Sequence, residues 1–131
     1  MKRRTLLVGV DPLTQKIASR AEIDEKFPLN LIGFVEVGAE MLGKKITGVE
    51  VIGSTHELPQ LIQKLSIEEV IFSSKSLSYE QILKHILSFK GKVGYKVIPE
   101  SALNSENGEV PFLELGFVRK PNLFQRLIEP R

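Results

Sequence analysis

The residues of this chain best suited to chemistry form an interrupted glycine turn near its start. Gly9 follows a short apolar run, and Asp11 and Thr14 occupy the positions where the dinucleotide-binding loop G-x-G-x-x-G/A has its second and third small residues. In that loop the second glycine lets the backbone approach a pyrophosphate, and the third lets the helix pack close to the strand. Asp11 adds a side chain and a negative charge instead. The turn therefore predicts the scaffold of a nucleotide site with an altered phosphate loop.

Asp11 has two interpretations. Because Pro12 follows it, Asp11 is a typical helix N-cap, whose carboxylate accepts hydrogen bonds from the first free amides of the helix. A bound phosphate would need the same amides. The two negative groups would compete for one helix end, and self-capping is the interpretation that we favour.

Glu36 is the second candidate, because it follows the predicted second strand. A cofactor domain keeps an acid at about this place to bind a ribose hydroxyl. If Glu36 faces the cleft, its charge would repel a 2′-phosphate and favour NAD over NADP. The alternative is a solvated glutamate at a strand end.

A polar segment after a later apolar run completes the candidate site. Ser73, Ser74, Lys75 and Ser76 could bind a phosphate through hydroxyl groups and an ammonium, or they could form a polar loop whose serines start the next helix. The predicted cofactor-binding residues are Gly9, Val10, Asp11, Leu13, Thr14, Glu36, Ser73, Ser74 and Lys75.

Catalytic and metal-binding patterns are not found in the sequence. Neither Tyr79 nor Tyr95 has a lysine four residues later, so the Tyr-x-x-x-Lys pair of short-chain reductases is absent. His56 and His85 lack metal-ligand spacing and are expected at the surface. We predict no catalytic residue and no metal ligand, and we expect that this domain alone is not an enzyme.

Apolar runs and helix-start signals alternate along the chain, which indicates βαβ units with right-handed crossovers. Strands are predicted at residues 5–8, 29–35, 49–52, 69–72 and 92–98. Helices are predicted to begin at Asp11–Pro12, at the capping box Ser54–Glu57 and at Ser78. The predicted fold class is α/β, a three-layer Rossmann-like fold with a mainly parallel sheet of about five strands.

The remaining segments set the predicted domain division. Residues 38–48 are expected to form a loop with room for one helical turn, and residues 110–115 a strand or an edge segment. Residues 123–128 are expected to form one or two amphipathic turns. We predict a Rossmann-like nucleotide-binding domain over 1–99, and a C-terminal extension or linker towards a further domain or membrane segment over 100–131.

Composition excludes several classes of function. The 131 residues are 42% hydrophobic and 26% charged, as in ordinary globular domains. The net charge of +2 is too small to indicate a nucleic-acid partner. The absence of cysteine excludes disulfides and thiolate chemistry. No apolar run reaches the roughly 18 residues that a membrane span needs.

Successive blocks of the sequence resemble one family of domains. The blocks are residues 5–9, 31–36, 48–54, 57–59 and 67–72, in that order. They are similar to the CoA-binding-like Rossmann domain of bacterial polysaccharide-synthesis enzymes: polyprenyl-phosphate sugar-1-phosphate transferases and nucleotide-sugar dehydratases or epimerases. Residues 72–78, together with Lys120-Pro121-Asn122 and Arg126-Leu127, resemble the related domain of family 2 glycosyltransferases most.

The resemblance implies a non-catalytic accessory domain of a larger, membrane-associated glycosyltransferase or sugar-phosphate transferase in cell-surface polysaccharide synthesis. The implied ligand is NAD or another nucleotide, and the implied location is the cytoplasmic face of the inner membrane. The expected partners are a nucleotide-type small molecule, the catalytic domain of the parent protein and a second copy of the chain, with no nucleic acid. Two alternatives stay open: the NAD-binding part of a nucleotide-sugar epimerase or dehydratase, and a structural docking or oligomerisation domain without ligand.

Overall fold

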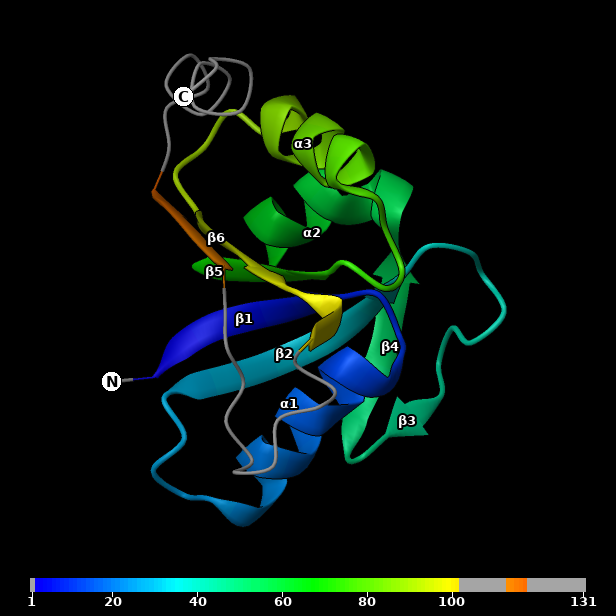
Figure 1. The fold of residues 1–131 in the computed structure, drawn as a ribbon, viewed down its shortest axis with the longest axis vertical. Helices are drawn as coiled ribbons and strands as arrows, with labels where there is room; N and C mark the ends of the chain where they lie inside the picture. The colour runs from blue at the N-terminus through cyan, green and yellow to red at the C-terminus, as the bar shows by residue number, and fades with distance from the viewer. Residues whose placement is uncertain (1, 102–112, 118–131) are drawn as a thin grey trace.

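The computed structural model describes residues 2–101 and the backbone of residues 113–117. Its centre is a seven-stranded sheet of order β3-β4-β2-β1-β5-β6-β7 (Figure 1). Five neighbouring strands are parallel: β1 (Arg3–Val8), β2 (Leu29–Glu36), β4 (Val49–Ser54), β5 (Glu69–Ser73) and β6 (Gly94–Ile98). Each edge carries one antiparallel strand: β3 (Lys45–Ile46) and β7 (Leu113–Phe117). The predicted α/β, Rossmann-like class with a mainly parallel sheet is confirmed.

Helices cover both faces of the sheet, which gives the three layers seen in Figure 1. The helix α1 (Pro12–Ile23) lies on one face, and α2 (Leu58–Lys64) and α3 (Tyr79–Ser88) lie on the other. Successive residues of a strand point to opposite faces. In β1, therefore, Leu7 packs in the core beneath α1, while Leu6 and Val8 pack in the core beneath α2 and α3.

Two of the predicted helix-start signals are confirmed as helix N-caps. Asp11 is the N-cap of α1, and Ser78 is the N-cap of α3, where its hydroxyl accepts from the Gln81 amide at 3.1 Å. The Glu57 carboxylate accepts from the Ser54 amide at 3.1 Å, but this capping box opens a short 3-10 turn, η1 (Thr55–Glu57). Helix α2 follows from Leu58.

One predicted loop is wrong in part. Within residues 38–48, the strand β3 forms a hairpin with β4, in which Lys45 pairs with Glu50 and Ile46 with Val49. The turn needs positive φ at both Thr47 and Gly48, with values of 51° and 77°. A β-branched residue rarely adopts that conformation, so the sequence carries no ordinary hairpin signal here.

The strand β7 lies within the predicted extension 100–131 and pairs with β6. The division at residue 99 stays a prediction. The amphipathic segment expected at 123–128 lies outside the described residues. Among the residues that the structure describes, no helix has both the length and the apolar character needed to cross a bilayer.

The order of the strands places the functional crevice. From β1 the chain moves outward through β2 and β4, and it then returns to the other side of β1 through β5 and β6. Strand order therefore reverses between β1 and β5. In open α/β sheets, ligands bind at the carboxyl ends of the strands beside this point.

Candidate functional site

The turn after β1 requires glycine at residue 9. Gly9 has φ of +101°, which side-chain-bearing residues rarely adopt. A Cβ atom here would also lie 2.7 Å from Cβ of Ser76 and 3.1 Å from Cβ of Ser73. The backbone at Gly9 is therefore packed directly against the loop that follows β5.

The Asp11 carboxylate accepts four hydrogen bonds. Its Oδ1 accepts from the Leu13 amide at 2.8 Å and from the Thr14 amide at 3.2 Å. Its Oδ2 accepts from the Ser73 hydroxyl at 2.5 Å and from the Ser76 hydroxyl. Asp11 is itself buried. One carboxylate therefore caps α1 and joins the turns that follow β1 and β5.

Thr14 fixes the shape of this turn. Its hydroxyl donates to the Gly9 carbonyl at 2.6 Å and accepts from the Asp11 amide at 3.3 Å, which completes the capping box. The Leu13 side chain packs in the core beneath α1, so Leu13 contributes only its amide to the turn. The Gly9 carbonyl, the Asp11 amide and the Thr14 hydroxyl are thus all paired within the turn.

These contacts do not fit a dinucleotide pyrophosphate at the start of α1. A pyrophosphate there uses the free amides of the helix and the open space above the glycine turn. Here the amides of Leu13 and Thr14 donate to Asp11, and Ser76 occupies the space beside Gly9. The Asp11 charge would also repel a phosphate.

The segment after β5 makes contacts of its own. The Ser74 amide donates to the Ile98 carbonyl at 3.1 Å, and the Lys75 amide donates to the Ser73 hydroxyl at 3.2 Å. The exposed Lys75 ammonium lies 3.7 Å from a Glu100 carboxylate oxygen. Lys75 thus pairs with an acid and does not line the pocket described below.

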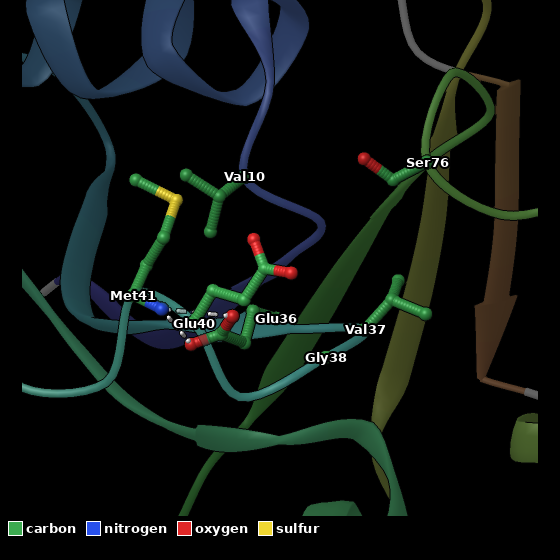
Figure 2. Close-up of a pocket in the computed structure, with 7 residues that line it drawn as sticks. All are labelled: Val10, Glu36, Val37, Gly38, Glu40, Met41 and Ser76. Carbon is green, nitrogen blue, oxygen red and sulfur yellow. Dashed lines mark hydrogen bonds between the residues drawn. The ribbon is translucent and has the colours of Figure 1, made fainter.

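Glu36 lies where the ribose-binding acid was expected, at the end of β2. Its buried carboxylate accepts from the Met41 amide, at 3.1 Å to Oε1 and 3.0 Å to Oε2 (Figure 2). This bond closes the loop between β2 and β3 over the carboxyl end of the sheet. Glu36 is therefore a buried acid with a structural partner, and not a glutamate free in solvent.

Glu36 also lines a pocket of about 290 Å³ beside the Gly9 turn. The lining residues are Val10, Glu36, Val37, Gly38, Glu40, Met41 and Ser76. Figure 2 shows Val10 and Met41 on one side of this pocket and Ser76 on the other. The lining has two carboxylates, of Glu36 and Glu40, and no basic side chain. Such a surface attracts hydroxyl and amine donors and repels phosphate.

The structure thus separates the predicted site residues. Val10 and Glu36 line the pocket, and Gly9, Asp11, Thr14 and Ser73, with the Leu13 amide, form the closed turn network beside it. Ser74 and Lys75 do not line the pocket. Ser76, which belongs to the polar segment predicted after β5, also lines the pocket. The sequence-based prediction missed Glu40 and Met41. Met41 binds Glu36 through its backbone amide, which leaves no sequence signal.

The histidines lie apart from this pocket. His56 is exposed, with Nδ1 at 2.9 Å from the Ser54 hydroxyl. His85 is partly exposed on α3, and its ring stacks on Phe72 at a centroid distance of 6.3 Å. Burial lowers the pKa of His85. Within residues 2–101 and 113–117, no group of three or more potential ligands could hold a metal ion.

Comparisons with known proteins relate the fold to solved structures. No protein-family model matches the chain, and no curated protein matches it in sequence. The crystal structure of UDP-D-quinovosamine 4-dehydrogenase from Vibrio fischeri is similar over 94% of this chain and 98% of that one, with TM-score 0.69 and 19% identity. The fold is a Rossmann fold.

Other similar structures are those of RSP, a Rex-family repressor. Its complex with β-NADH matches 65% of this chain and 39% of that one, with TM-score 0.53 and 24% identity. Its complex with β-NAD+ and operator DNA matches 75% and 44%, with TM-score 0.54 and 22% identity. This chain therefore resembles less than half of RSP, and at these identities the likeness concerns the fold.

Proposed function

We propose that this domain is a non-catalytic accessory module that binds the ribose of a nucleotide-type ligand. The parent protein would be a larger, membrane-associated glycosyltransferase or sugar-phosphate transferase of cell-surface polysaccharide synthesis. One observation carries the ligand part of the proposal. The buried Glu36 carboxylate lines a pocket at the carboxyl end of β2, beside the turn that follows β1.

The chemistry of the pocket suits a sugar diol. A carboxylate has about four acceptor positions, so the single Met41 amide leaves Glu36 able to accept from two ribose hydroxyls. Val10 and Met41 offer apolar surface for the sugar or the attached base. The negative charges of Glu36 and Glu40 would repel a 2′-phosphate.

The context of the proposal comes from two likenesses. The sequence blocks resemble domains of polysaccharide-synthesis enzymes, and the fold resembles the UDP-D-quinovosamine 4-dehydrogenase structure along most of both chains. In this proposal the chemistry is carried out by another domain of the parent protein. The Rossmann module would sense or hold a nucleotide-type ligand for it.

Titration calorimetry with adenosine and uridine tests the role of Glu36. Glu36→Gln keeps an oxygen for the Met41 amide but loses the charge, so we expect binding to weaken by about tenfold or more. Glu50→Gln, on the exposed part of β4, is the matched control and should bind as the wild type does. Equal affinity of Glu36→Gln and wild type would contradict the proposal.

A second candidate function is favoured by the closed phosphate turn. Because Asp11 and Ser76 fill the crevice between β1 and β5, the domain could serve as a docking or oligomerisation unit without ligand. Sedimentation velocity separates the two proposals. A stable dimer whose assembly Glu36→Gln leaves unchanged, together with no nucleoside binding, would support docking.

The third alternative is the NAD-binding part of a nucleotide-sugar epimerase or dehydratase. It requires a pyrophosphate at the start of α1, and the contacts of Asp11 oppose one there. We therefore rank it behind the other two.

A further inference from the structure

The four donors that face the Asp11 carboxylate form a set that suits a phosphate. Two are helix amides, of Leu13 and Thr14, and two are hydroxyls, of Ser73 and Ser76. Amides at a helix start and neighbouring hydroxyl groups are the donors that proteins use for phosphate groups. In this chain an internal carboxylate takes all four.

The position of Asp11 in the loop explains why its carboxylate, and not a ligand phosphate, binds these four donors. Gly9 keeps the positive φ of a phosphate-binding turn, but Asp11 stands at the second glycine of G-x-G, where the backbone would approach a pyrophosphate. The carboxylate therefore lies between the helix and any ligand phosphate. Ser76 closes the same space from the β5 side.

We propose that Asp11 is a built-in substitute for a ligand phosphate and determines the specificity of the pocket. The ligand class is then a ribonucleoside moiety that presents hydroxyl groups to Glu36 and no phosphate to α1. This inference rests on the proposed function for its ligand. Its claim about Asp11 can be tested separately.

The acidic lining of the pocket also disfavours a ligand phosphate. Ser76 belongs both to the Asp11 network and to the pocket wall, so the two features share one boundary. A nucleoside 5′-diphosphate bound through Glu36 would bring its charge towards Asp11 and Glu40. An uncharged nucleoside meets no such repulsion.

The experiment measures how the full chain and three variants bind adenosine, uridine, ADP, UDP and NAD+ by titration calorimetry. Asp11→Gly restores G-x-G and removes the carboxylate, and glycine is a tolerated N-cap. Asp11→Asn keeps the N-cap and removes only the charge. Asp24→Gly, at the other end of α1, is the matched control.

In the wild type we expect a nucleoside to bind at least about tenfold more tightly than its diphosphate. Asp11→Gly should raise the affinity for ADP, UDP or NAD+ by about tenfold or more, and Asp11→Asn should give a smaller gain. Asp24→Gly should give none. If Asp11→Gly does not fold, Asp11→Asn carries the test.

The outcomes separate this inference from the proposed function. If wild type binds a diphosphate as tightly as the nucleoside, and neither Asp11 variant gains affinity, the substitute role is overturned and the Glu36 site survives. If wild type binds no nucleoside but Asp11→Gly gains a diphosphate, the substitute role is supported and the proposed function falls. If no probe binds any folded variant, both are overturned.

Discussion

The Asp11 carboxylate accepts from the Ser73 hydroxyl at 2.5 Å, although 62 residues separate the two in sequence. Asp11 starts α1 on one face of the sheet, and Ser73 ends β5 on the other side of the strand-order reversal. The bond therefore closes the crevice in which a Rossmann domain ordinarily holds its ligand. Asp11, which the local sequence identifies as a helix N-cap, therefore also joins two distant parts of the chain.

Replacing Asp11 should destabilise the fold strongly. Asp11→Ala removes the N-cap of α1 and leaves two buried or partly buried hydroxyls without their acceptor, so we expect a loss of about 2–4 kcal/mol in unfolding free energy. Urea denaturation measures it. The control is Asp24→Ala: the Asp24 carboxylate accepts from the exposed Lys26 amide, and its loss should cost under about 1 kcal/mol. Similar losses in both variants would refute a buried role for Asp11.

Gly9 should tolerate alanine far less well than Gly43. Both glycines have positive φ, of +101° and +84°, but only at Gly9 would the new Cβ meet the neighbouring loop, at 2.7 Å from Ser76. Nothing lies within 4 Å of the Cβ position at Gly43. We expect Gly43→Ala to cost roughly 1 kcal/mol from backbone strain, and Gly9→Ala at least twice as much. Thermal unfolding of the two variants checks this; equal melting temperatures would contradict the packing argument.

Removing the charge of the buried Glu69 carboxylate should also destabilise the fold strongly. This carboxylate lies 3.2 Å from the Lys96 ammonium on β6 and 3.1 Å from Nε of Arg3 on β1. Glu69→Gln removes the carboxylate that faces the largely buried Lys96, so we expect a loss of roughly 3 kcal/mol in chemical denaturation.

An exposed ion pair provides the control for Glu69. Glu80 and Lys84 lie one helical turn apart on α3 at 3.7 Å, and Glu80→Gln should cost less than about 0.5 kcal/mol. The double variant Glu69→Gln/Lys96→Met should lose less than the sum of its single changes, because both changes break the same ion pair. Strict additivity would show that Glu69 and Lys96 are not coupled.

Tyr95 should make the fold sensitive to alkali. Burial raises the pKa of Tyr95 from 10.0 to about 12, and within the described residues its buried hydroxyl has no hydrogen-bond partner. Because the folded pKa lies above the unfolded one, this contribution to stability is complete below pH 10 and is lost as the pH rises from 10 towards 12. The loss should reach up to about 2 kcal/mol.

The variant Tyr95→Phe isolates this effect. It should be neutral or slightly stabilising at pH 7, since the hydroxyl that it removes has no partner in the part of the chain that the structure describes, and its stability should fall less above pH 10. Tyr79→Phe, at an exposed tyrosine, should follow the wild-type profile. If all three proteins lose stability in parallel from pH 9 to 12, the titration of Tyr95 has no part in it.

Local signals in the sequence were enough to predict most of the fold. Asp11 before Pro12 and Ser78 before Gln81 are caps that act within one turn, so their residue types alone identify them. The apolar runs that became β1 and β5 are buried on both faces, which gives them a strong hydrophobic signal. The hairpin at Thr47–Gly48 was missed because its strand has two residues and its turn an unfavourable residue type.

The chemistry of the site depends on contacts that no local pattern encodes. The sequence predicted that Glu36 would end the second strand, but not that the Met41 amide would hold its carboxylate. Likewise, capping by Asp11 was foreseen, but its bond to Ser76 depends on how two loops 65 residues apart are packed. Such contacts follow from the register of the sheet, which the sequence alone did not provide.

The central place of β1 also has a consequence for how the chain is made. On one side β1 pairs with β2, and on the other side it pairs with β5, where Val8 lies opposite Phe72. Because β5 comes later in the sequence, this second side of β1 is paired last. Until residues 69–73 have left the ribosome, the apolar segment from Leu6 to Val8 has unpaired backbone groups along the edge that faces β5 in the folded protein. A nascent chain paused before that point offers this edge to strands of its neighbours, and synthesis of β5 ends the exposure.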